Sequence, residues 1–286
     1  MSDGTAPADG TAAAAADAAR RRFSFNHATA RFWPIPDLVA GALDAGIGGI
    51  GLWREQVAEY GLEKTAALVR EAGIPVTSLC RGGFFNAPNW YDENRRAIDE
   101  AATLGTPVLV LVSGGLPPDS RDLDGARRHV GEAIAALVPH ALAAGVRLAI
   151  EPLHPMFCSD RCVVSSLSQA LDLAAPFPPH AVGVVVDTYH LWWDDQVWTQ
   201  LARAGRQERI ACFQVADWIT PLPEGALLGR ALPGDGCIEL RRFRQAVDAA
   251  GYTGPIEVEV FHADVWARPG REVLDAALAG YLDHVV

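Results

Sequence analysis

Short apolar runs alternate with amphipathic helical segments along almost the whole chain, and this alternation constrains the fold more than any other feature. The runs recur at a spacing of roughly thirty residues. The eight candidate strands are FSFNH (23–27), GIGLW (49–53), PVTSLC (75–80), PVLVLV (107–112), VRLAIE (146–151), VGVVVD (182–187), RIACFQV (209–215) and PIEVEVF (255–261). Several are continuously apolar and β-branched, which is typical of parallel strands buried on both faces. Eight βα units in about 260 residues predict an α/β fold, a single-domain (β/α)8 TIM barrel.

The competing arrangement is a doubly wound open sheet, which would carry a glycine-rich phosphate loop after its first strand. The segment after the first candidate strand, within FNHATARFWPIP (25–36), has no such loop. The glycines of GIGGIGLW (46–53) precede and enter a strand, whereas a phosphate loop leaves a strand for a helix. The sequence therefore favours the closed barrel.

The first residues differ in composition from the rest of the chain. Residues 1–22 are rich in Ala, Gly and Asp and carry their basic side chains at the far end, the reverse of a secretory signal. We expect a disordered N-terminal tail over 1–22 and the barrel over 23–286. No apolar run is long enough to span a membrane, so we expect a soluble protein without a membrane partner.

Charge and cysteine usage narrow the functional class. The net charge is −11, and no basic face is evident that could neutralise phosphates, which argues against nucleic acid as a partner. The five cysteines are an odd number in a long chain and indicate a reducing, cytoplasmic location. Cys158 and Cys162 form a C-x3-C pair, but no second pair with zinc-site spacing follows.

Polar side chains follow four consecutive candidate strands at the end where a barrel carries its active site. Glu151, Asp187 and Gln214 lie at the ends of the fifth, sixth and seventh strands. In the eighth, Glu257 and Glu259 point the same way because side chains alternate along a strand. Periodicity cannot choose between these two, and we favour Glu259 because it is nearer the strand end.

Three carboxylates that converge on one point would repel each other unless a cation held them. A set of hard oxygen ligands without thiolate suits Mn²⁺ best, with Mg²⁺ or Co²⁺ as alternatives, and is unlike a structural zinc site. The strand ends therefore predict a divalent metal site.

Residues 23–280 resemble the xylose isomerase-like TIM barrel superfamily of sugar phosphate isomerases and epimerases, which includes ketose 3-epimerases and inosose-processing enzymes. The resemblance rests on five motifs in the order and spacing of that family: IEPLHP (150–155), VDTYHLWWD (186–194), FQVADW (213–218), GRALPGDGCIEL (229–240) and GYTGPIEVEVF (251–261).

The resemblance implies roles for specific residues. Glu151, Asp187, Gln214 and Glu259 are similar to the family's metal ligands, and Glu151 and Glu259 to its catalytic acid/base pair. His190 and Arg230 are similar to residues that bind substrate oxygens. Gln214 departs from the pattern, since many epimerases of the family have His there, while some lyases of the family resemble this chain at that position.

Further candidates for substrate binding lie near the ends of strands. They are His27, Trp53, His154 and Trp193. Each also has a purely structural explanation, because histidines and tryptophans in such loops often pack against the core.

These observations predict a divalent-metal-dependent sugar isomerase or epimerase of carbohydrate metabolism that acts on a keto-sugar, an inosose or a related polyhydroxy ketone. A carboxylate would remove a proton and leave an enediolate whose charge develops on oxygens in contact with the metal. The alternative is a metal-dependent lyase or dehydratase on the same scaffold, similar to dehydroshikimate dehydratases. A non-enzymatic metal-binding barrel is a third hypothesis. A homo-oligomer is compatible with the sequence.

Overall fold

The computed structural model of the protein describes residues 9–223 and 226–286. Its barrel strands are β1 (Phe23–Asn26), β2 (Gly49–Trp53), β3 (Val76–Gly83), β4 (Val108–Val112), β5 (Arg147–Ile150), β6 (Val182–Asp187), β7 (Ile210–Val215) and β10 (Ile256–Val258). All neighbouring strands pair in parallel and close in the order β1-β10-β7-β6-β5-β4-β3-β2. The predicted (β/α)8 barrel is confirmed.

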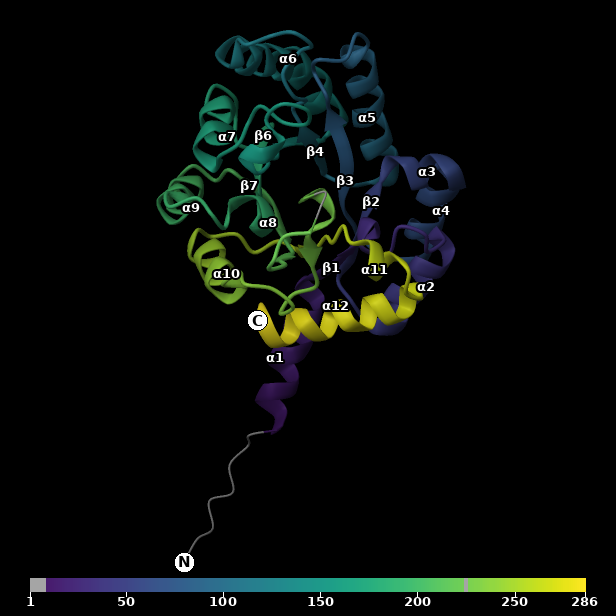
Figure 1. Ribbon diagram of the computed structural model, residues 1–286. Helices are drawn as coiled ribbons and strands as arrows, with labels where there is room; N and C mark the ends of the chain where they lie inside the picture. The colour runs from purple at the N-terminus through teal and green to yellow at the C-terminus, as the bar shows by residue number, and fades with distance from the viewer. Residues whose placement is uncertain (1–8, 224–225) are drawn as a thin grey trace, which may run out of the picture.

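Helices surround the barrel on its outside (Figure 1). They are α1 (Asp9–Arg22), α2 (Ile35–Ala45), α3 (Arg54–Tyr60), α4 (Leu62–Ala72), α5 (Trp90–Leu104), α6 (Leu123–Ala144), α7 (Leu167–Ala174), α8 (Thr188–Leu191), α9 (Val197–Arg206), α10 (Leu240–Ala249), α11 (Ala263–Trp266) and α12 (Gly270–His284). Within the described residues, none of them is long and apolar enough to cross a membrane.

The helix-to-strand turns follow from local sequence. α5 buries Ala97, Ile98, Ala101 and Leu104, which recur on one face of a helix with 3.6 residues per turn. The helix ends at Gly105, whose φ of 73° lies in the left-handed region that a residue without Cβ adopts at little cost. The chain then turns back to begin β4.

Two apolar layers hold the barrel together. The larger lies between the strands and the outer helices. The smaller fills the barrel interior with compact side chains: Cys80, Val108, Val110, Ala149, Val185, Ala211 and Cys212. Because this interior is packed with side chains, the barrel is closed beneath the polar groups at the strand ends.

The N-terminal segment differs from the expectation of a disordered tail over 1–22. Residues 9–22 form α1, and residues 1–8 lie outside the described residues. A run of alanines favours helix, and the last turn docks on the barrel. Ala19 is buried, and Tyr281 Oη of α12 donates a hydrogen bond to its carbonyl oxygen at 3.1 Å. Figure 1 shows α12 crossing α1 at this point.

Arg22 makes the strongest polar contacts of α1. Its guanidinium pairs with Asp248 Oδ1 at 2.8 Å and donates to the carbonyl oxygens of Gly254 and Tyr252 at 3.1 and 3.3 Å. These bonds fix the entry of the chain into β1, next to β10.

We expect Arg22→Ala to lower the free energy of unfolding by about 1–2 kcal/mol, because three partly exposed hydrogen bonds are lost. Urea unfolding followed by circular dichroism measures the difference. The neighbouring Arg21 is exposed and serves as the matched control, with an expected change within about 0.5 kcal/mol for Arg21→Ala. Equal effects of the two substitutions would contradict the docking role of Arg22.

Candidate active site

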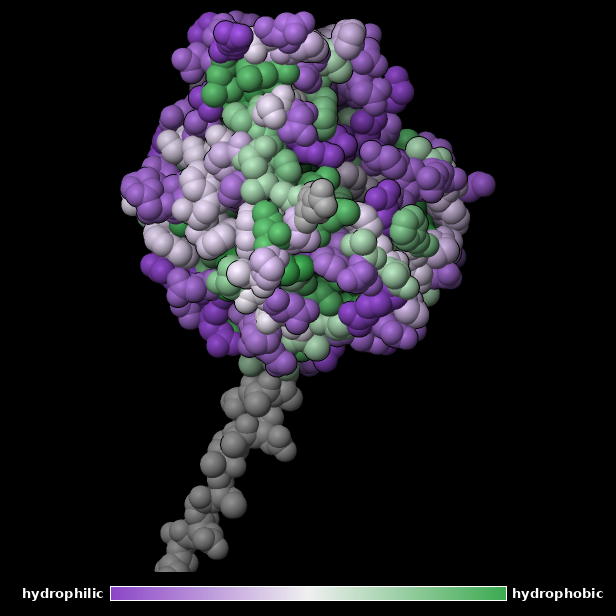
Figure 2. All heavy atoms as spheres, in the orientation of Figure 1, coloured by the Kyte–Doolittle hydropathy of each residue, from purple (hydrophilic) through white to green (hydrophobic). Residues whose placement is uncertain are grey.

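A pocket of about 430 Å³ opens at the C-terminal end of the barrel. Its walls include Trp53 from the end of β2, Arg81 from β3, Glu151 just after β5 and Glu259 just after β10. Figure 2 shows apolar side chains gathered around the centre of this end, with hydrophilic residues around them. This is the end at which TIM barrels bind substrates.

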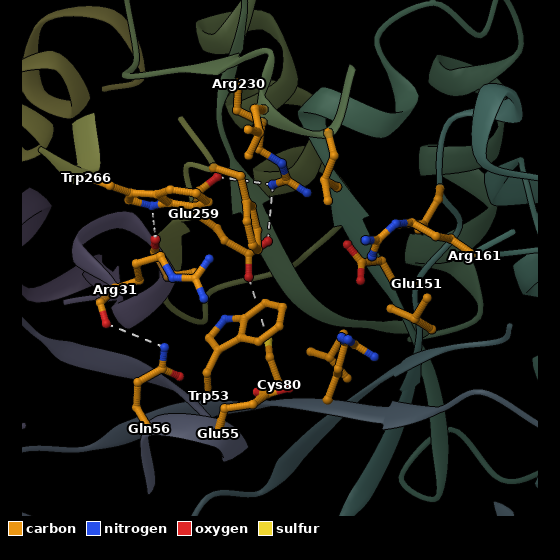
Figure 3. Close-up of a pocket in the computed structure, with 18 residues that line it drawn as sticks. Arg31, Trp53, Glu55, Gln56, Cys80, Glu151, Arg161, Arg230, Glu259 and Trp266 are labelled. Carbon is orange, nitrogen blue, oxygen red and sulfur yellow. Dashed lines mark hydrogen bonds and ion pairs between the residues drawn. The ribbon is translucent and has the colours of Figure 1, made fainter. Parts of the chain in front are cut away.

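Three buried carboxylates lie at the inner end of the pocket. Glu151, Asp187 and Glu259 are each at most 5% exposed. Carboxylate oxygens of Glu151 and Asp187 and a ring nitrogen of His190 lie within 4.8 Å of one another. Figure 3 shows Glu151 and Glu259 approaching the pocket from different sides.

Arg230 connects these carboxylates. It lies in β9 (Arg230–Ala231), which pairs with β8 (Asp217–Trp218). Its Nη1 is 3.0 Å from Asp187 Oδ2 and 3.1 Å from Glu259 Oε2. The guanidinium carbon is 5.0 Å from the ring centres of both Tyr189 and Phe261, so its position is fixed by stacking as well as by charge.

A loop anchored by Asp217 supports this short two-stranded sheet. The Asp217 carboxylate accepts hydrogen bonds from the backbone N–H groups of Gly234 and Ile238, at 3.0 and 2.9 Å. These contacts hold the PGDG turn (233–236) close to β8. The turn therefore helps to hold Arg230 over the carboxylates.

Burial and mutual repulsion change the pKa values of the acidic groups. Burial, followed by the charges of Glu259 and Asp187, raises the pKa of Glu151 well above its usual range. Burial raises the pKa of Glu259 to about 7, with Arg230 acting in the opposite direction. Burial also raises the pKa of Asp187. A single arginine thus offsets only part of the cost of this carboxylate cluster.

Gln214 lies between Asp187 and Glu257 in the strand register. Its Nε2 donates to Glu257 Oε1 at 2.9 Å, while its buried Oε1 has no hydrogen-bond partner among the described residues. Burying an amide oxygen without a partner is costly. The hydrogen bond from Nε2 to Glu257 fixes the amide so that Oε1 is the atom left free to accept.

Glu257 orients this amide from below. Its carboxylate accepts hydrogen bonds from Asn26 Nδ2 at 2.7 Å, from Thr77 Oγ1 and Ser78 Oγ at 2.8 Å, and from Gln214 Nε2. Four donors around one carboxylate satisfy it without a cation. Glu257 therefore belongs to a layer beneath the pocket, whereas Glu259, two residues later, lines the pocket.

A glycine makes room for this layer. A Cβ atom at Gly51 in β2 would lie 2.6 Å from Glu257 Oε2 and 2.9 Å from Asn26 Nδ2. Glu257 can therefore fill the barrel only beside a residue without a side chain.

The donor set suits a hard divalent cation. Asp187 Oδ1 accepts from the backbone N–H of Tyr189, while its buried Oδ2 and Gln214 Oε1 have no hydrogen-bond partner among the described residues. Asp187 Oδ2 lies near Arg230, but not in hydrogen-bonding geometry. With Glu151 and Glu259, these atoms are the oxygen ligands that such cations prefer.

His190 is a neutral member of the cluster. Burial and the charge of Arg230 lower its pKa well below the usual value. Its Nδ1 lies 3.1 Å from the backbone nitrogen of His154. Its Nε2 lies 3.0 Å from Arg230 Nη2 and 3.8 Å from Asp187 Oδ2.

The other predicted substrate-binding residues occupy different places. Trp53 lines the pocket. His154 packs against Trp193, with ring centres 5.4 Å apart, and neither residue is part of the pocket wall. His27 is buried outside the wall, with Nε2 2.7 Å from the carbonyl oxygen of Trp33.

The pocket also contains residues that strand-end reasoning did not select. Cys80 faces the barrel mouth, with Sγ 3.7 Å from Glu259 Oε1. Burial and nearby carboxylates raise its thiol pKa well above the usual value, so it stays protonated. Arg31, Arg161 and Trp266 reach the wall from loops and a short helix, where the strand pattern carries no signal.

The chain belongs to the xylose isomerase-like TIM barrel family, whose sequence model matches residues 39–279. The predicted family membership is confirmed. No curated protein sequence matches this chain significantly.

Solved structures share this fold. Protein SMc04130 from Sinorhizobium meliloti 1021 is 46% identical, with a TM-score of 0.89 over 92% of this chain and 98% of that one. An IOLI protein with a bound zinc atom is 20% identical, with a TM-score of 0.77 over 92% and 98% of the two chains. A 3-keto-D-glucoside 4-epimerase from E. coli is 19% identical, with a TM-score of 0.68 over 91% and 97%.

We expect Glu257→Gln to lower the free energy of unfolding by about 2–4 kcal/mol, because an amide cannot accept from all four donors that surround it. Chemical unfolding in urea measures the change. Glu55→Gln, at an exposed glutamate of the same pocket, is the matched control and should change stability by about 0.5 kcal/mol or less. A stable Glu257→Gln protein would show that the layer tolerates loss of the charge.

The raised pKa of Glu259 predicts a pH dependence of stability. A carboxyl group whose pKa is higher in the folded chain stabilises the fold while it is protonated, and this contribution is lost as the pH rises through the folded value, about 7. Chelator-treated protein should therefore have a lower Tm at pH 8 than at pH 6, as measured by calorimetry. The slope should be smaller in Glu259→Gln, and an unchanged slope would contradict the assignment.

Proposed function

We propose that this chain is a divalent-metal-dependent enzyme that removes the proton beside a ketone, and that it works as an isomerase or epimerase on a keto-sugar, an inosose or a related polyhydroxy ketone. The observation that carries the proposal is the buried cluster of Glu151, Asp187 and Glu259 with the unpartnered Gln214 Oε1 beside it. A pocket of about 430 Å³ above the cluster is large enough for a small polyol.

Asp187 and Gln214 would hold the metal together with Glu151 and Glu259. When bound, the cation would polarise the carbonyl and lower the cost of forming negative charge on the substrate oxygens. We favour Mn²⁺ from the hard oxygen ligands, and the zinc of the related IOLI structure makes Zn²⁺ a necessary comparison.

Glu151 and Glu259 are the proposed acid/base pair. They approach the pocket from different sides (Figure 3), so one can take a proton from one face of a substrate carbon and the other can return one to the opposite face. Burial raises the pKa of Glu259 to about 7, which supports a role for this group in proton transfer. Arg230, held against Glu259, would stabilise negative charge on a substrate oxygen.

The printed names of structural relatives support sugar chemistry. One is a 3-keto-D-glucoside 4-epimerase, and another is a D-psicose 3-epimerase solved in the presence of D-fructose. Both are below 20% identical to this chain, so they support the reaction class and not a particular substrate. Loss of a β-hydroxyl after the same proton abstraction would make the chain a dehydratase, which the experiment below separates by its product.

We expect Glu151→Gln and Glu259→Gln each to lower solvent-deuterium incorporation into the active ketone by about 10²–10⁴-fold, the usual effect of losing an acid/base group. The assay incubates the protein and Mn²⁺ with ketoses, inososes and dehydroshikimate in D₂O and follows exchange by NMR. Glu55→Gln is the matched control, since it removes a charge from the same pocket at an exposed position.

The same assay tests the metal and the reaction type. Chelator should abolish exchange, and added Mn²⁺ should restore it. Deuterium in a recovered substrate or its isomer indicates an isomerase or epimerase, whereas loss of water indicates the dehydratase. Full exchange in Glu151→Gln, or exchange that is indifferent to chelator, would overturn the proposed function.

A further inference from the structure

The pocket wall contains three arginines besides Arg230. Arg230 pairs with Asp187 and Glu259, but Arg31, Arg81 and Arg161 also line the pocket. Among residues 9–223 and 226–286, these three guanidiniums make no ion pair and donate no hydrogen bond to any partner. In a chain with a net charge of −11, three arginines without a partner among the described residues gather around one pocket, and such a wall suits an anionic ligand.

Aromatic contacts position the Arg81 guanidinium without using its N–H groups. Its central carbon lies 4.3 Å from the ring centre of Phe84 and 5.7 Å from that of Trp53. Stacking of this kind restrains an arginine and leaves its donors free to bind a carboxylate or phosphate. Glu55 is the acidic group with the largest effect on Arg81, but it lies beyond ion-pair distance and is exposed.

Arg161 lines the same pocket as Arg81. The charge of Arg161 contributes, after burial, to lowering the pKa of Arg81. The loop that carries Arg161 is held by hydrogen bonds from the backbone N–H groups of Arg161 and Cys162 to the carbonyl oxygen of Phe157, at 3.0 and 2.9 Å. Two arginines in the wall of one pocket are stabilised when an anion binds there.

Arg31 lies on a different side of the pocket from Arg161. Figure 3 shows Arg161 beside Glu151 and Arg31 on the other side of the pocket, near Trp266. Arg31 is exposed, and its guanidinium carbon lies 4.7 Å from the ring centre of Trp266. A ligand that reaches the carboxylate cluster would thus meet Arg161 on the Glu151 side, and the charge of Arg81 also acts on Glu151.

We propose that Arg81 and Arg161 form an oxyanion subsite, so that the preferred substrate is an acidic polyhydroxy ketone carrying a carboxylate or a phosphate group. This inference rests on the proposed function for the position of the reacting carbon. The two arginines bind the acid group, and the carboxylate cluster acts on the other end of the molecule.

Equilibrium binding of two matched pairs of probes tests the subsite. Dehydroshikimate against an inosose compares a carboxylate-bearing cyclic ketone with a neutral one, and fructose 6-phosphate against fructose makes the same comparison for phosphate. Isothermal titration calorimetry with Mn²⁺ present should give at least a tenfold preference for the acidic member of one pair. The pair that shows the preference identifies the acid group.

Arg81→Gln and Arg161→Gln should each reduce that preference by about 10–100-fold or abolish it, the usual effect of losing a hydrogen bond between charged groups. Arg95→Gln is the matched control. Arg95 stacks on Tyr91 at 5.9 Å and lies outside the pocket wall, so its removal should leave the preference unchanged. Testing both arginines separately guards against one variant that folds poorly.

No preference for either acidic probe in the native protein, or an unchanged preference in both pocket variants, would overturn the subsite. Solvent-deuterium exchange into neutral ketones reports on the proposed function independently of this binding preference. Acid-dependent binding without any exchange would leave the subsite standing and refute the proposed reaction. Exchange without acid-dependent binding would support the proposed reaction and refute the subsite.

Discussion

The arrangement of this site depends on three carboxylates buried together at one end of a closed barrel. Glu151, Asp187 and Glu259 are taken from water by the packed interior below and the loops above. Each buried negative charge raises the cost of the others, and a single arginine contacts two of them. The cluster therefore requires protonation, a cation or both. A carboxyl group whose pKa is raised toward neutral pH by burial is suited to exchange protons there.

The layer beneath the cluster contains a further carboxylate, Glu257, whose surroundings differ from those of the three carboxylates above it. Glu257 and Glu259 lie on the same side of one strand. Four hydrogen-bond donors surround the Glu257 carboxylate, whereas Glu259 pairs with Arg230 and lines the pocket. Glu257 in turn fixes the Gln214 amide so that its oxygen is the free end. The neutral Gln214 amide, oriented in this way, adds a free oxygen to the cluster without adding a fourth negative charge.

Charge is distributed in two zones of the pocket. The inner zone is acidic and suited to a cation, whereas Arg81 and Arg161 make the Glu151 side of the wall basic. A ligand with an acid group at one end and a ketone at the other would match both zones. Membership of the xylose isomerase-like TIM barrel family does not by itself predict this arrangement. Arg81 lies in β3, whereas Arg161 stands in a loop.

The sequence by itself determined the barrel and the residues at its strand ends. Continuous β-branched runs at regular spacing have few ways to bury both faces, and the parallel strand ends must then meet at one edge. The same reasoning predicts that Glu151, Asp187, Gln214 and Glu259 lie together at that edge. It also expected a disordered tail where residues 9–22 form a helix, because composition does not reveal the docking of Arg22 on Asp248.

Only the tertiary structure decided which of two equivalent glutamates faces the pocket, since a period of two residues places both on one side. It also shows that Cys80 lies against Glu259 and that His27 lies outside the pocket wall. Arg31, Arg81 and Arg161 come from three segments far apart in the chain, and their convergence follows from barrel closure and loop packing. Contacts of this kind depend on distances across the fold, which no local pattern of residues encodes.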